Sequence, residues 1–129
     1  MVSGQDGPGA QALRTAHEAF NERDRDTLLG VLAEDIDWHG PLQGTLRGRA
    51  EVWERFFAPL WEAPVRTEVH DILDNGEHVV ALAQVVFDVP DGPRSWKVCE
   101  VCHCNAAGQV TERWATVENE QEFIEFARR

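Results

Sequence analysis

The spacing of hydrophobic residues divides the chain into a helical first half and a strand-rich second half. Apolar residues recur at helical spacing over residues 9–22, 27–32 and 52–60, which predicts three helices. Asp26 is expected to cap the second helix, because an Asp side chain accepts hydrogen bonds from the free N–H groups at a helix start. Pro64 closes the third helix, since proline cannot continue the helical hydrogen bonding.

Beyond Pro64, apolar and polar residues alternate, as they do in strands that bury one face. The alternation predicts strands over residues 66–73, 78–89, 94–104 and 109–118. The turns between them carry Asn75-Gly76, Asp91-Gly92 and Ala106-Ala107. Short turns of this kind are typical of hairpins, so these strands should form an antiparallel meander. A shorter strand is expected earlier, over residues 35–39.

A short helix bearing Phe123 and Phe126 is predicted at the end of the chain, and Asn119 with Glu122 matches the spacing of a capping box at its start. Helices followed by strands are typical of an α+β fold, with three N-terminal helices packed on one face of a curved antiparallel sheet. We expect a flexible leader over residues 1–8 and a single domain over residues 9–129.

Composition and charge narrow the class of protein. The chain has 129 residues, of which 43% are hydrophobic and 27% charged, enough apolar material for a core. A formal net charge of -11 disfavours nucleic acid and anionic membranes as partners. No apolar run is long enough to span a membrane, and the first ten residues lack the features of a signal peptide. We therefore expect a cytoplasmic protein.

Residues 99–104 read Cys-Glu-Val-Cys-His-Cys, which contains the C-x-x-C-H spacing of haem attachment. Haem attachment of this type requires export, and the first ten residues carry no export signal. The segment also lies in a predicted strand, where Cys99 and Cys102 point to opposite faces. We therefore expect free thiols, no metal and no cofactor.

Two-residue turns fix which residues face each other across the predicted hairpins. They place His70 opposite Ala81, Ala83 opposite Glu100, Glu100 opposite Arg113, and Val98 opposite Ala115. One face of the sheet then gathers a mostly apolar set with one acid and one base, namely Phe87, Val85, Ala83, Trp96, Val98, Glu100, Arg113, Ala115 and Val117. We expect this face to lie under the helices. Glu100 and Arg113 form either a structural ion pair or a working pair in a cleft, because a buried pair by itself adds little stability.

The opposite face of the predicted sheet is also apolar, with Val86, Cys99, Val101, Val110 and Trp114. An apolar second face calls for a partner, and a second copy of the chain is the simplest one. We expect a homodimer with Trp114 and Val101 near the centre of the interface.

The histidines have both structural and functional interpretations. His39 ends the short strand and is either a surface residue or, if Gly40-Pro41 redirects it, the proton carrier of a site. His70 is a weaker candidate for a pocket wall. His17 lies on the apolar stripe of the first helix, and we expect a core or rim histidine there.

Residues 33–40, 46–52 and 108–118 together resemble the SnoaL-like polyketide cyclase family, within the superfamily of nuclear transport factor 2 and ketosteroid isomerase. The resemblance covers the chain from about Ala12 to Phe126. It implies a cone of helices and curved sheet around a deep apolar pocket, usually in a dimer.

The resemblance also implies roles for single positions. Counting back from Gly48 places His39 at the base of the isomerase, and counting back from Gly108 places Glu100 at its oxyanion-hole acid. The isomerase tyrosine has no counterpart, because the chain contains no Tyr. Similar limonene epoxide hydrolases have an Asp where this chain has Ala115. A neighbouring Arg113 should keep Glu100 ionised.

We therefore predict an acid–base enzyme of the cyclase or isomerase type, without a cofactor, that acts on a small apolar carbonyl compound. His39 is expected to move the proton, and Glu100 and Arg113 to polarise or orient the substrate. The residues expected to line the pocket are Trp38, Trp53, Phe57, His70, Ala83, Phe87, Trp96, Val98, Ala115 and Val117. The alternatives are a non-catalytic small-molecule-binding protein and a protein-interaction module of the same fold.

Overall fold

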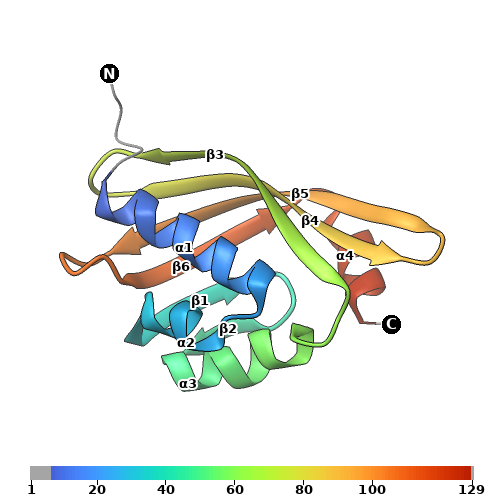
Figure 1. Cartoon of the computed structure of the whole chain (residues 1–129), viewed down its shortest axis with the longest axis horizontal. Coiled ribbons are helices and arrows are strands. Elements are labelled where there is room, and N and C mark those ends of the chain that lie inside the picture. Colours follow the sequence, from blue (N-terminus) through green and yellow to red (C-terminus); the bar gives the residue numbers. More distant parts are fainter. Residues whose placement is uncertain (1–6, 129) are drawn as a thin grey trace.

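The computed structural model describes residues 7–128, which form a mixed α+β fold around one curved sheet (Figure 1). The helices in this part of the chain are α1 (Pro8–Glu22), α2 (Arg25–Gly30), α3 (Arg49–Val52) and α4 (Glu120–Ala127). The helix begun by α3 continues as a π-helical turn, η2 (Trp53–Phe57), and a 3₁₀ turn, η3 (Ala58–Leu60). The strands are β1 (Leu32–Gly40), β2 (Gly44–Arg47), β3 (Val65–Asp74), β4 (Val79–Val89), β5 (Gly92–Cys104) and β6 (Val110–Val117). Most of the predicted leader lies outside the described residues, but Pro8 already belongs to α1.

The strands follow the order β2-β1-β6-β5-β4-β3, and the predicted meander from β3 to β6 is confirmed. The expectation of a purely antiparallel sheet is wrong, since β1 pairs parallel with β6 and antiparallel with β2. Turn residues indicate only hairpins between strands that follow each other along the chain. They carry no signal for a pairing between strands near opposite ends of the sequence.

All three hairpin registers differ from prediction by two residues, and the Asn75-Gly76 hairpin has a four-residue turn, because Asp74 pairs with Val79. Val89 pairs with Gly92, so Pro90 and Asp91 form the tight turn in place of Asp91-Gly92. Gly92 has a φ of 111°, a conformation that side chains disfavour. Glu100 consequently lies opposite Ala81 and Ala115 instead of Ala83 and Arg113. A shift of two residues by itself leaves a side chain on its predicted face, because side chains alternate with a period of two.

A bulge also interrupts β3. Because Asp74 pairs with Val79, Ile72 takes the place opposite Ala81 that His70 is predicted to occupy, and the register shifts again between Val69 and Asp71. The extra residue of a bulge is left out of the regular pairing. His70 is therefore exposed rather than directed at the helices.

Both predicted helix caps are wrong. Asp24, and not Asp26, caps α2, because its carboxylate accepts from the backbone N–H of Thr27 at 3.2 Å. Asn119 has a left-handed backbone and its side chain makes no cap. Glu122 instead accepts from the indole Nε1 of Trp96 at 2.9 Å, which joins α4 to β5.

The apolar core lies between the helices and one face of the curved sheet, where α1 runs across the strands (Figure 1). Leu28, Ile36, Ile72 and Trp96 are almost fully buried in it. Side chains of this size each stabilise the fold by about 1.5–3 kcal/mol when buried. Between residues 7 and 128, no helix is long and apolar enough to cross a membrane.

Apolar side chains on the other face of the sheet are only partly covered. Val80, Val101 and Trp114 follow one another across β4, β5 and β6 and are half-buried. Leu73, next to Val80, is 49% exposed. Val110 belongs to the core cluster rather than to this face, contrary to prediction.

Arg23 ties the end of α1 to the segment before β3. Its guanidinium donates to the carbonyl oxygens of Phe20, Trp61, Ala63 and Val65 at 2.6–2.9 Å. Its Cζ also lies 4.5 Å from the centre of the Phe20 ring. One cation therefore holds the chain over residues 61–65 against the first helix.

We expect Arg23→Met to lower the free energy of unfolding by about 2 kcal/mol, because several carbonyl groups lose a charged donor. Urea unfolding followed by circular dichroism measures the loss. Arg25→Met is the matched control, since the exposed Arg25 only stacks on the Trp53 ring at 4.5 Å. Its loss should not exceed about 1 kcal/mol. Equal losses in the two variants would contradict the role assigned to Arg23.

Candidate functional site

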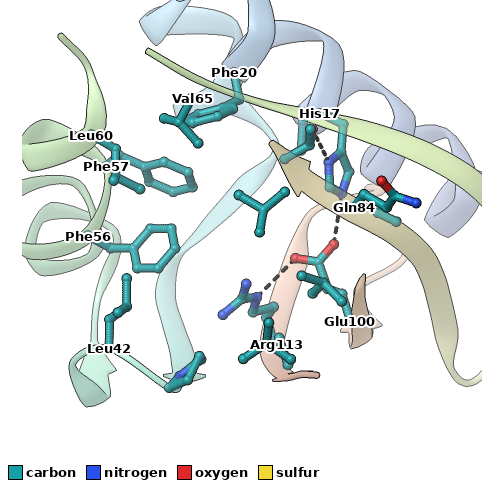
Figure 2. A pocket seen from close by; sticks show the side chains of 18 of the residues that line it. His17, Phe20, Leu42, Phe56, Phe57, Leu60, Val65, Gln84, Glu100 and Arg113 are labelled. Carbon is teal, nitrogen blue, oxygen red and sulfur yellow. Dashed lines mark hydrogen bonds and ion pairs between the residues drawn. The ribbon is translucent and has the colours of Figure 1, made fainter. Parts of the chain in front are cut away.

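A cavity of about 130 Å³ lies between the helices and the inner face of the sheet. Figure 2 shows Phe56, Phe57 and Leu60 on one side and the polar side chains of Glu100 and Arg113 on the other. The consecutive residues Phe56 and Phe57 both reach the cavity from the π-helical turn η2, a deviation often found at functional sites. The cavity thus has one apolar side and one polar side.

Three side chains on the polar side form a hydrogen-bonded row (Figure 2). Oε1 of Glu100 lies 2.9 Å from Nε2 of His17, and Oε2 accepts from Nε of Arg113 at 2.9 Å. Glu100 and Arg113 are 8% and 7% exposed. Among residues 7–128, they are the charged residues that the fold buries. The predicted ion pair is confirmed, although Arg113 lies opposite Cys102 and reaches Glu100 diagonally across the strands.

Arg113 is held on several sides. Its Nη1 donates to the carbonyl oxygen of His39 at 3.2 Å, and its Cζ lies 4.1 Å from the centre of the Trp38 ring and 5.5 Å from that of Phe56. Gly40 permits this approach, since a Cβ there would meet Nη1 at 3.0 Å. A guanidinium carries five N–H donors, so donors beyond those bound to Glu100 and His39 remain to meet a ligand oxygen.

The two neighbours of Glu100 in the hydrogen-bonded row determine its ionisation. Burial alone raises the pKa of this carboxyl, but the charges and hydrogen bonds of His17 and Arg113 outweigh burial and lower the pKa to about 2. Glu100 is therefore a carboxylate at neutral pH and accepts hydrogen bonds from both neighbours.

His17 is placed by the contact between α1 and β3. Its Nδ1 lies 2.9 Å from Oγ1 of Thr67. The side chain of Asn21, one turn further along α1, donates to the backbone oxygen of Thr67 at 2.8 Å and accepts from its N–H at 2.9 Å. These contacts hold the imidazole between the edge strand and Glu100.

Most of the predicted pocket residues lie on the cavity wall. Besides Glu100 and Arg113, these are Trp38, Phe57, Ala83, Phe87, Val98, Ala115 and Val117. The strand residues among them share the inner face because the alternation of the strands survives the change in register, whereas Phe57 reaches the cavity from η2. What each of them does for a ligand stays a prediction.

His39 does not reach the cavity, so its predicted place in the site is wrong. Its Nδ1 lies 3.0 Å from Oγ1 of Thr45 and its Nε2 3.3 Å from a carboxylate oxygen of Glu112, and its side chain is 36% exposed. Strand β1 continues as far as Gly40, so alternation turns Trp38 inward and His39 outward. Only the backbone oxygen of His39 contributes, by accepting from Arg113.

Three predicted wall residues also lie elsewhere. His70 is exposed at the bulge of β3. Trp53 packs against Trp61 with ring centres 4.8 Å apart and carries Arg25 on its face. Trp96 is buried under α4, 5.5 Å from the ring of Phe123. The sequence pattern predicts that the two tryptophans are covered, but not which neighbours cover them.

Sequence reasoning missed His17 and Thr67 as members of the site. His17 does lie on the predicted apolar stripe with Leu13 and Phe20, and a polar residue in such a stripe is the signal that was available. That stripe cannot show that Thr67 from β3 and Glu100 from β5 meet the two ring nitrogens. Only the packing of α1 across the sheet brings them together.

The cysteine-rich segment forms part of β5, as predicted. Cys99 lies opposite Leu82 and Thr116, and Cys102 opposite Val79 and Arg113, so the two point to different faces. All three thiols are free. Burial, more than the nearby Asp74, raises the pKa of Cys104 to about 11. Among the described residues, no group of three or more His, Cys, Asp and Glu side chains could hold a metal ion.

We expect Glu100 to make stability depend on pH. The pKa of Glu100 is about 2 in the folded protein, against 4.5 for an unperturbed Glu side chain. As the pH falls, the carboxyl is therefore protonated first in the unfolded chain. The contribution of the Glu100 carboxylate to the free energy of unfolding is complete above about pH 5, and it is about 2 kcal/mol smaller at about pH 3. Glu100→Gln should cost about 3 kcal/mol at neutral pH, by leaving Arg113 unpaired. Urea unfolding should show that the difference in unfolding free energy between the wild type and Glu100→Gln narrows by about 2 kcal/mol in acid. A difference that stays constant with pH would contradict an ionised, paired Glu100.

Solved structures of other proteins share this fold. Bal32a, from a soil-derived mobile gene cassette, is similar with a TM-score of 0.82 and 20% identity, over 94% of this chain and 97% of that one. TerC, co-crystallised with polyporic acid, has a TM-score of 0.80 and 20% identity, over 95% and 100% of the chains. IdmH of Streptomyces antibioticus, provisionally described as a polyketide cyclase, has a TM-score of 0.76 and 21% identity, over 93% and 98%. Likeness at these identities shows the fold alone.

The sequence itself matches one family. No curated protein matches the chain. The SnoaL-like domain, in contrast, matches residues 13–113, a stretch that contains His17, Glu100 and Arg113. This match covers most of the chain and confirms the resemblance drawn from residues 33–40, 46–52 and 108–118. With the cavity and the strand order described above, it shows that the chain belongs to the SnoaL-like domain family.

Proposed function

We propose that the protein is an acid–base enzyme that isomerises or cyclises a small apolar carbonyl compound in the cavity. The observation that carries the proposal is the row of His17, Glu100 and Arg113 on the wall of an otherwise apolar cavity. A buried ion pair gains little stability, because both groups lose their hydration. Its place beside an imidazole and a ligand-sized space supports a chemical role.

Each member of the row has a distinct part in this proposal. Arg113 stabilises the negative charge that develops on a carbonyl oxygen when the carbon beside it loses a proton. Glu100 remains ionised and orients His17, as the buried carboxylate of a catalytic triad does. His17 takes up and returns the proton, a role suited to imidazole at neutral pH.

The size of the cavity limits the substrate. A cavity of about 150 Å³ in another protein binds benzene, and this one measures about 130 Å³. This space therefore suits a ligand portion about as large as a single ring. Its oxygen would face Arg113 and its hydrocarbon body would lie against Phe56 and Phe57. Two fold neighbours, one crystallised with polyporic acid and one provisionally described as a polyketide cyclase, support a small organic ligand.

We expect the purified protein to convert β,γ-cyclohexenone into the conjugated α,β-isomer. The base removes a proton from the α-carbon, the electron pair passes onto the carbonyl oxygen beside Arg113, and the proton returns at the γ-carbon. The rise in ultraviolet absorbance of the conjugated ketone measures the rate. Glu100→Gln and His17→Gln should each lower kcat by at least about 100-fold.

His39→Gln is the matched control and should retain the wild-type rate, because His39 lies on the outer face. Loss of activity in this control would contradict the site proposed here. A wild-type protein that binds phenol by calorimetry yet leaves the ketone unchanged would favour the non-catalytic binding protein. Absence of both binding and turnover would favour the interaction module.

We also propose that two copies of the chain pair through the outer face of the sheet. Supporting this, Val80, Val101 and Trp114 form a half-buried apolar row beside the exposed Leu73. Apolar surface of this kind is costly to leave in water, and a two-fold axis would place the row of one copy against the same row of the other.

Trp114→Glu is expected to turn the proposed dimer into a monomer, because it places a charge in the apolar row. Multi-angle light scattering at micromolar concentration gives the molar mass. Arg55→Glu, at an exposed position of η2 far along the chain from the row, is the control and should stay dimeric. A Trp114→Glu protein with the wild-type mass would place the interface elsewhere.

A further inference from the structure

We propose that the hydroxyl group of Thr67 is the point at which His17 meets a substrate, and that it passes the substrate's proton to the imidazole. This inference rests on the proposed function. It adds a residue that neither the helical stripe nor the strand alternation singles out, on the edge strand β3.

The first step is the position of hydrogen on His17. Because Glu100 is ionised, its Oε1 can only accept, so the ring nitrogen 2.9 Å away, Nε2, carries a hydrogen. In its neutral form, the form that can act as a base, the imidazole then has its lone pair on Nδ1. Nδ1 lies 2.9 Å from Oγ1 of Thr67, so the threonine hydroxyl donates to it.

The second step is the position of Thr67. Both ring nitrogens of His17 are occupied, and Thr67 itself lines the cavity. The hydroxyl uses its hydrogen toward Nδ1 and keeps two lone pairs. Oδ1 of Asn21 is 3.5 Å from Oγ1, longer than an ordinary hydrogen bond. A lone pair of Oγ1 is therefore the basic position that His17 can present to a ligand.

The two proton transfers take place together, and the atoms and charges balance. The bond between the substrate's α-carbon and its hydrogen breaks, and that proton binds to Oγ1 of Thr67. The original hydroxyl proton of Thr67 moves to Nδ1, which gives an imidazolium beside the Glu100 carboxylate. The electron pair left on the substrate moves to the oxygen beside Arg113. The reverse movement delivers the proton to the product carbon.

Thr67→Val tests the transfer with little change of shape. Valine keeps the branched outline that suits a strand, and the two hydrogen bonds between Asn21 and the backbone of Thr67 do not use the side chain. With β,γ-cyclohexenone as the probe, we expect kcat to fall about 100-fold while KM changes by less than about twofold. Thr67→Ser restores the hydroxyl and should recover most of the rate.

A second measurement follows the hydrogen bond without turnover. Long-range ¹H–¹⁵N spectra of the free protein, recorded at a pH at which the His17 imidazole is neutral, should show its hydrogen on Nε2 and an Nδ1 shift typical of a hydrogen-bond acceptor. In Thr67→Val, the Nδ1 shift should move to that of an unpaired ring nitrogen. Thr67→Ser should restore the wild-type shift.

The outcomes separate this inference from the proposed function. Wild-type activity that survives in Thr67→Val overturns the relay and leaves the proposed function standing, with Glu100 or His17 acting directly. A wild-type protein inactive toward the ketone overturns the proposed function and, with it, the catalytic relay. A hydrogen on Nδ1 in the spectra, or an Nδ1 shift that Thr67→Val leaves unchanged, overturns the Thr67 contact whatever the activity. Loss of kcat in Thr67→Val, recovery in Thr67→Ser and the expected shifts together support it.

Discussion

The buried pair of Glu100 and Arg113 constrains the rest of the structure. Two opposite charges that have left water must satisfy each other and fill their remaining hydrogen-bonding positions with protein groups. Glu100 therefore has His17 on its second oxygen, and Arg113 has the His39 carbonyl and the Trp38 ring beside it. The partners come from α1 and β1, and the pair itself comes from β5 and β6. The pair therefore links the first helix to three strands of the sheet.

The same constraint divides the cavity into two unlike sides. Polar atoms gather on the wall formed by β5, β6 and α1, which leaves the opposite wall to the aromatic side chains of η2. A regular helix would turn Phe56 and Phe57 further apart, whereas the π-helical turn brings both to the cavity. A ligand in such a space has its orientation fixed by its oxygen, because the aromatic side offers it no hydrogen bond.

Strand β1 connects the fold to the site in an unexpected manner. Its parallel pairing with β6 brings Trp38 under Arg113 and turns His39 to the other face. A histidine at the sequence position that the family resemblance marks as a base thus lies outside, while a histidine on the first helix occupies the polar wall. The site therefore does contain an imidazole, but α1 supplies it and β1 does not.

Sequence spacing is sufficient to predict which residues share a face of the sheet or of a helix. Alternation along β5 and β6 placed Glu100 and Arg113 together on the inner face, and a register error of two residues did not disturb this, because the period is two. The helical stripe likewise predicted burial of His17. Tertiary structure alone decided that β1 pairs with β6, that Asp24 rather than Asp26 caps α2, and that Thr67 and Glu100 meet His17. These contacts join segments that are far apart along the chain, or depend on the exact end of an element. Local spacing carries no information about either, since it records only which side of its own element a residue faces.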